Sequence, residues 1–121
     1  MNPAFRSLLW YLLVGTRGGP NRCRIVELLH RSPANAHQVA SALELDYRTV
    51  RHHLRLLEQN QVVTRSVPGA YAPPYELSPY LAEQFEAVAE LIHPPAPAPE
   101  RRRRSPAPAP GWGTRSAIGG P

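Results

Sequence analysis

The chain has little of what disulfide bonding or catalysis requires. It contains one cysteine in 121 residues, Cys23, which excludes an intramolecular disulfide and any site built from several thiolates. The sequence has no nucleophile elbow, phosphate-binding glycine loop or two-histidine zinc motif. We therefore expect a protein of the reducing cytoplasm that is not an enzyme and carries no cofactor.

Long apolar runs are also missing. The run from Leu8 to Val14 covers seven residues, far fewer than the ~20 that span a bilayer. The segment Gly15 to Gly19 offers no convincing signal-peptide cleavage site. We expect no membrane partner, and predict that residues 1–15 form an apolar helix that packs on the C-terminal helix of the same chain or of a partner. The residues with helical spacing are Phe5, Leu8, Leu9, Leu12 and Leu13.

Lysine is absent, which we attribute to coding bias, and the positive charge is unevenly distributed. The net charge is +5, yet residues 20–93 hold seven arginines against eight acidic residues, and the surplus lies in the flanks. Bulk charge therefore does not indicate that the folded part binds nucleic acid. The informative feature is local, because Arg48, Arg51 and Arg55 fall within one short segment.

Residues 46–59 are predicted to form an amphipathic helix with a cationic outer face. At about 100° per residue, one side is apolar apart from a histidine, and comprises Val50, His53, Leu54 and Leu57. The other side and its flanks hold the candidate DNA contacts, which are Arg48, Thr49, Arg51, His52, Arg55 and Gln59. Arginine can pair in a fork with guanine or phosphate, and glutamine and histidine can bond to base edges. Taken alone, such a face suits a solvated helix as well as one in a major groove.

The preceding segments favour the second interpretation. A first helix is predicted from Pro20 to Arg31, where proline occupies a helix start. Asn35 and Gln38 have the spacing of a capping box that opens a short second helix. Asp46 is expected to N-cap the basic helix. This order of helix, short helix, turn and basic helix is that of a helix-turn-helix.

A short β-hairpin, or wing, is predicted next. Val62–Val67 is β-branched and alternating, Pro68-Gly69 suits a turn, and Tyr75–Leu77 supplies the returning strand. Arg65 on the first strand is a further candidate DNA contact. Prolines in Ala72–Pro74 cannot donate ladder hydrogen bonds, so we expect the wing to be short.

Over roughly residues 16–92 the chain resembles winged-helix regulators of the arsenic-repressor type, most closely an archaeal branch. The motifs are TRGGPNRCRIVELL, NAHQVASALELDYRTVRHHLRLLEQNQVV and YELS. The resemblance implies a mainly α winged helix-turn-helix with a small β-hairpin, and a transcriptional regulator that binds double-stranded DNA as a homodimer. Gln61 stands where such proteins usually have a helix-ending glycine. We expect Asn60, which tolerates left-handed backbone, to end the helix instead.

Residues 79–93 are predicted to form a C-terminal dimerisation helix. The pattern is a heptad seam of Leu81, Phe85, Val88 and Ile92. In a chain this small the seam could also pack within the domain.

Two sensor sites are possible alternatives. Glu86, Glu90 and His93 share one helical stripe, but the paired Asp and His of metal-sensing relatives are missing. We favour an acidic solvated face and assign no metal ligands. Cys23 near the start of the first helix could be a redox-active thiol, although a small, partly buried residue is the simpler interpretation.

From Pro94 the composition changes to proline, alanine and arginine, and residues 94–121 are expected to be a disordered tail. Its Pro-Ala repeats should hold Arg101–Arg104 away from the folded part. The predicted organisation is thus an N-terminal helix at 1–15, a winged helix-turn-helix domain at 16–78, the C-terminal helix and the tail. The alternative function is a winged-helix module that binds another protein without specific DNA binding. No small-molecule ligand is evident from the sequence.

Overall fold

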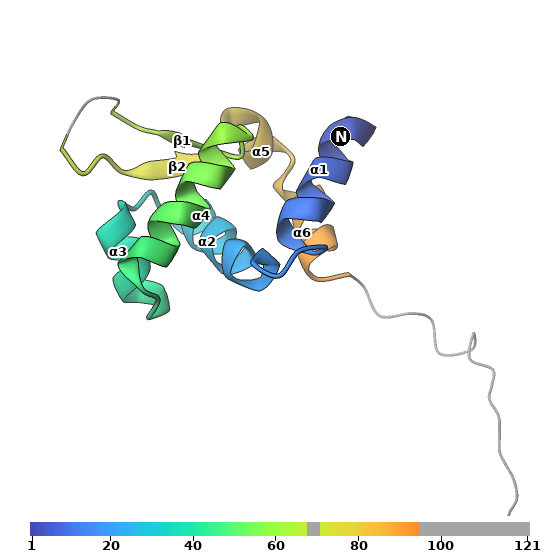
Figure 1. Cartoon of the computed structure of the whole chain (residues 1–121). Helices are drawn as coiled ribbons and strands as arrows, with labels where there is room; N and C mark the ends of the chain where they lie inside the picture. Colours follow the sequence, from blue (N-terminus) through green and yellow to red (C-terminus); the bar gives the residue numbers. More distant parts are fainter. Residues whose placement is uncertain (68–70, 95–121) are drawn as a thin grey trace, which may run out of the picture.

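A computed structural model describes residues 1–67 and 71–94 (Figure 1). The elements are α1 (Pro3–Leu13), α2 (Gly19–Arg31), α3 (Ala36–Leu43), α4 (Tyr47–Gln59), β1 (Val63–Arg65), β2 (Tyr75–Leu77), α5 (Pro79–Glu83) and α6 (Phe85–Ile92). The predicted mainly α winged helix-turn-helix with a small hairpin is confirmed. The Pro68-Gly69 turn and the tail after Pro94 lie outside the described residues.

Local capping chemistry fixes where the helices of the helix-turn-helix begin. The side chain of Asn35 accepts from the amide of Gln38 at 2.8 Å, and the Gln38 side chain accepts from the Asn35 amide at 2.9 Å. This is the predicted capping box at the start of α3. The Asp46 carboxylate accepts from the amides of Arg48 and Thr49 at 3.0 and 3.2 Å, which starts α4.

One hydrophobic core joins every helix and both strands. It contains Leu9, Leu12, Leu13, Ile25, Val26, Leu29, Ala36, Val39, Val50, Leu54, Leu57, Val62, Val63, Leu77, Leu81 and Val88. The predicted inner face of α4 is buried throughout, including His53. Helix α1 packs on α2 and α6, so the N-terminal helix shares the core of the helix-turn-helix. Figure 1 shows α1 and α6 side by side at one end, with the hairpin at the other.

The wing is short, as predicted. Val63 pairs with Leu77 and Arg65 with Tyr75 in antiparallel register. Tyr75 also exchanges two backbone hydrogen bonds with Ala34, of 2.8 and 3.1 Å, across an isolated bridge. The base of the wing is therefore tied to the segment between α2 and α3.

Asn60 ends α4 as its C-cap, as predicted, but it does not adopt left-handed backbone. Asn60 has φ −99°, whereas Gln61 itself has φ +62°. The amide of Gln61 donates to Glu58 O at 3.0 Å and that of Val62 to Leu57 O at 2.9 Å. These two bonds form a Schellman motif, which satisfies the last carbonyls of α4 and offsets the cost of a left-handed glutamine.

The predicted continuous helix at 79–93 is also wrong, because the chain breaks at Gln84 into α5 and α6. Leu81 and Val88, two members of the predicted seam, are fully buried in the core. Phe85 is half-buried, and its ring stacks on His30 with centroids 3.6 Å apart. Both halves of the segment contribute to one core. Most of the predicted seam therefore packs within the chain and is not available to a partner subunit.

Candidate nucleic-acid interface

The outer face of α4 presents the predicted residues together. Arg48, Arg51, His52, Arg55 and Gln59 are exposed, and Thr49 on the flank is half-buried. Four of these residues, together with Tyr47, line one shallow depression along the helix. The sequence prediction of an inner core side and an outer cationic side of α4 therefore matches the geometry.

Tyr47, the first residue of α4, was missed by sequence reasoning. Its hydroxyl accepts from Nη1 of Arg51 at 3.3 Å, and the Arg51 guanidinium lies 5.8 Å from the ring centroid. The hydrogen bond to Tyr47 raises the pKa of Arg51, so the guanidinium stays charged. His37 of α3 stacks on the other side of this contact, with ring centroids 4.2 Å apart. Tyr47 thus orients an arginine, and the i, i+4 spacing from Arg51 is the signal that reveals it.

Arg65 of β1 lies beside the same helix. Its Nε donates to Glu58 of α4 at 2.8 Å in an exposed ion pair. Arg65, Arg51 and Tyr47 line one notch of about 270 Å³ between α3, α4 and the wing. The wing arginine and the helix arginines therefore belong to one surface.

A buried arginine of α2 contacts the core-facing side of α4. Arg22 of α2 donates through Nε to the carbonyl of Leu12 at 2.7 Å and through Nη2 to the hydroxyl of Thr16. Its Nη1 lies 3.1 Å from Nδ1 of His53 on α4. Burial, and then the neighbouring Arg22 and His52, lower the pKa of His53. The ring is therefore neutral and its Nδ1 accepts a hydrogen bond from Arg22. His53 is the packed, interhelical residue that the sequence indicated.

Gly18 leaves room for this pair beside the backbone. A Cβ at Gly18 would lie 2.5 Å from Arg22 Nη1 and 2.8 Å from His53 Cε1. Its φ of −80° suits any residue, so the constraint on this position is space rather than backbone conformation.

The two alternative sensor sites receive no support from the geometry. The Cys23 thiol is half-buried and donates to Leu13 O at 3.0 Å, and burial raises its pKa, opposite to what a reactive thiolate needs. His93 Nε2 lies 2.6 Å from Glu27 on α2, away from Glu86 and Glu90. Residues 1–67 and 71–94 contain no group of three His, Cys, Asp or Glu side chains placed to hold a metal. Over the same ranges, every helix is too short or too polar to cross a membrane.

Comparison with known proteins identifies the type of domain. Residues 19–65 match the family model described as bacterial regulatory protein, arsR family. No curated protein matches the chain. Among solved structures, reduced HlyU from Vibrio cholerae shares 19% identity, has a TM-score of 0.56, and the match covers 74% of this chain and 92% of that one.

Two mycobacterial structures have the same fold. Rv0081 from M. tuberculosis shares 21% identity with a TM-score of 0.55, covering 76% of this chain and 90% of that chain. The winged helix-turn-helix DNA-binding domain of Mb0332 from Mycobacterium bovis, described as homodimeric and as a possible ArsR-family transcriptional regulator, shares 18% with a TM-score of 0.52. This match covers 76% of this chain and 86% of the Mb0332 fragment.

The structure is a winged helix-turn-helix, and its residues 19–65 form an arsR-family helix-turn-helix. The predicted resemblance to the arsenic-repressor type is confirmed, and the archaeal branch stays a prediction. The matched family model is described as that of a bacterial regulatory protein.

Proposed function

We propose that the protein is a sequence-specific transcriptional regulator that inserts α4 into the major groove of double-stranded DNA. The observation that carries the proposal is that Arg48, Arg51, His52 and Arg55 are all exposed on one face of a helix whose opposite face is buried in the core. A major groove admits one α-helix, and the N-terminal residues of the second helix in the motif lie closest to the bases.

The geometry suggests a division of roles among these contacts. Arg48, Thr49 and Arg51 are in the first half of α4 and are proposed to meet base edges, with Arg51 oriented by Tyr47. His52, Arg55 and Gln59 extend the contact along the groove. Arg65 on the wing is proposed to contact the sugar-phosphate backbone, because a surface ion pair with Glu58 is easily exchanged for one with phosphate.

We further propose that the protein acts as a homodimer through α1. The predicted seam is largely buried within the chain, whereas Trp10, Tyr11 and Val14 are 51%, 59% and 42% exposed. Exposed aromatic residues are typical of the anchors of protein interfaces. The homodimeric description of Mb0332 supports this proposal. A two-fold axis would place the two α4 helices on half-sites about 34–36 Å apart.

The same aromatic surface favours a second candidate function, a winged-helix module that docks on another protein without specific DNA binding. The two functions differ in what the arginines of α4 do. Replacing Arg48 and Arg51 should weaken DNA binding by a regulator, but should leave partner binding by a docking module unaffected.

Chromatin immunoprecipitation with sequencing tests the proposed function in the cell. A regulator of this kind should give sharp peaks that share an inverted repeat with half-sites one helical turn apart. Diffuse enrichment without a shared sequence would contradict specific recognition.

A further inference from the structure

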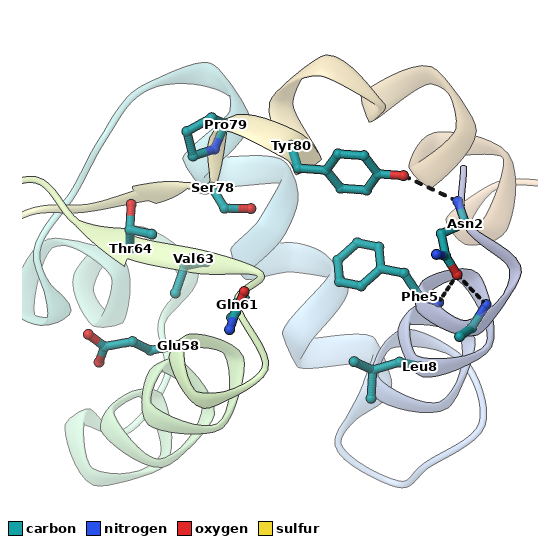
Figure 2. Close-up of a pocket in the computed structure, with 11 residues that line it drawn as sticks. Asn2, Phe5, Leu8, Glu58, Gln61, Val63, Thr64, Ser78, Pro79 and Tyr80 are labelled. Carbon is teal, nitrogen blue, oxygen red and sulfur yellow. Dashed lines mark hydrogen bonds between the residues drawn. The ribbon is translucent and has the colours of Figure 1, made fainter.

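A cavity of about 840 Å³ separates the N-terminal half of α1 from the base of the wing (Figure 2). Residues of α1, the C-terminal end of α4, β1 and the start of α5 line it. Its volume falls within the range of about 300–1,000 Å³ that is typical of small-molecule sites. It lies apart from the outer face of α4, because none of the cationic residues proposed to contact DNA lines it.

The walls of this cavity are apolar on both sides. Phe5 and Leu8 project from α1, and Val63 and Pro79 form the opposite side (Figure 2). The rings of Phe5 and Tyr80 meet edge to face, with centroids 5.4 Å apart and planes at 71°. The two rings therefore form an aromatic part of the cavity wall.

Hydrogen bonds at the ends of the cavity hold its walls in place. The amide of Asn2 donates to the Tyr80 hydroxyl at 3.2 Å, which ties the start of α1 to the start of α5. The Ser78 hydroxyl accepts from the Leu81 amide at 3.4 Å. Both hydroxyls act as acceptors in these bonds, so their protons are available to a ligand.

The charge of the lining selects against anions. Glu58 is the one acidic side chain among the described lining residues, its carboxylate is paired with Arg65 at 2.8 Å, and none of these residues is Arg, Lys or His. An anionic ligand would therefore find no cationic side chain in the lining to pair with. A neutral ligand would meet apolar walls and hydroxyl donors, which is the usual composition of a small-molecule site.

We propose that this cavity binds a neutral, mainly apolar small molecule that carries a ring and a hydrogen-bond acceptor. The ring would pack against Phe5, Tyr80 and Leu8, and the acceptor would accept a hydrogen bond from the hydroxyl of Tyr80 or of Ser78. A second copy of the chain is the less suitable occupant, because the exposed apolar residues Trp10, Tyr11 and Val14 lie outside the cavity lining. The site does not depend on DNA binding.

Fluorescence titration of the full-length protein with Nile red, a neutral aromatic dye, tests the site without DNA. Wild type should bind about one dye per chain and enhance its emission. Ala4→Trp and Thr64→Trp add bulk from opposite walls, and each should weaken binding about tenfold, a loss of about 1.4 kcal/mol. Ser7→Trp adds the same side chain to α1 outside the lining and should bind the dye like wild type.

Circular dichroism identifies variants that keep the wild-type fold. Because Ala4→Trp and Thr64→Trp both fill the cavity, the test can still be made if one of them misfolds. Equal dye binding by wild type and a folded filling variant would overturn the proposal. Tighter binding of the anionic dye anilinonaphthalene sulfonate than of Nile red would refute the charge assignment. Dye binding that is restricted to dilute, monomeric protein would show that a second copy covers the cavity, which also overturns it.

Discussion

The Nη1 atom of Arg22 lies 3.1 Å from Nδ1 of His53, so a buried contact joins α2 to the helix that carries the proposed DNA-binding face. The same guanidinium donates to the carbonyl of Leu12 at the end of α1. One side chain therefore links three helices. The contact requires a neutral His53, because a protonated ring would present a second positive charge to Arg22 in a buried site.

This relationship predicts that acid destabilises the fold through His53. Burial, Arg22 and His52 hold its pKa below the ordinary value of 6.5. Between the lowered folded pKa and 6.5, the unfolded chain binds more protons than the folded chain. The stabilisation is therefore fully present above pH 6.5 and is lost as the pH falls through that interval.

Urea unfolding of wild type and His53→Gln across the acid range measures this effect. Glutamine can accept from Arg22 through its carbonyl oxygen but does not titrate. Wild type should lose more free energy of unfolding below pH 6.5 than the variant. Parallel curves for the two proteins would show that His53 does not titrate in the manner described.

Arg22→Met should destabilise the protein by about 1–3 kcal/mol, because it leaves the Leu12 carbonyl and the His53 acceptor buried without their donor. Arg31→Met, on the same helix but exposed, should change stability by less than about 0.5 kcal/mol. Equal free energies of unfolding for the two variants would mean that the buried contacts of Arg22 contribute nothing specific.

The Arg22–His53 contact shows which features the sequence can predict and which it cannot. Periodicity placed Val50, His53, Leu54 and Leu57 on the buried side of α4, and capping chemistry placed Asn35 and Asp46 at helix starts, because both depend on neighbours within one turn. Arg22 and His53 are 31 residues apart, and no local pattern reveals that they meet.

Two features of local structure were not predicted. Gln61 adopts the left-handed conformation because two capping bonds to Leu57 and Glu58 offset its cost. The heptad spacing puts Leu81 and Val88 on one face whether or not the helix is continuous, so it could not predict the break at Gln84. Of the candidate site, the cationic face was predictable from α4 alone, whereas the Tyr47–His37 stack required the packing of α3 on α4.

The proposed dimer predicts that Tyr11→Glu converts the protein to a monomer, because a charge is placed in an apolar interface that offers no partner for it. Light scattering at micromolar concentration reports the mass. Tyr71→Glu makes the same change on the wing, at a residue that is 98% exposed, and should leave the dimer intact. A wild-type protein that is monomeric throughout would contradict the proposal, and an intact Tyr11→Glu dimer would place the interface elsewhere.

The tail prediction rests on sequence alone, since Arg101–Arg104 lie outside the described residues. Four phosphate contacts would steepen the slope of log affinity against log salt by roughly 3.6 units on B-DNA. Truncation after Pro94 keeps the His93–Glu27 contact and should remove that increment. The ratio of specific to random affinity should survive, because phosphate contacts do not read sequence. Identical slopes for full-length and truncated protein would show that the tail makes no such contacts.

The most direct test of the central claim is the affinity of the Arg48→Ala, Arg51→Ala double variant for a site recovered from chromatin. Fluorescence anisotropy at fixed salt should show a loss of about 1–3 kcal/mol for each arginine that reads a base, and a weaker preference over random duplex. A double variant with Arg6→Ala and Arg31→Ala removes the same charge from α1 and α2 and should retain that preference. Equal affinity and preference of wild type and the Arg48, Arg51 variant would contradict recognition of DNA by α4.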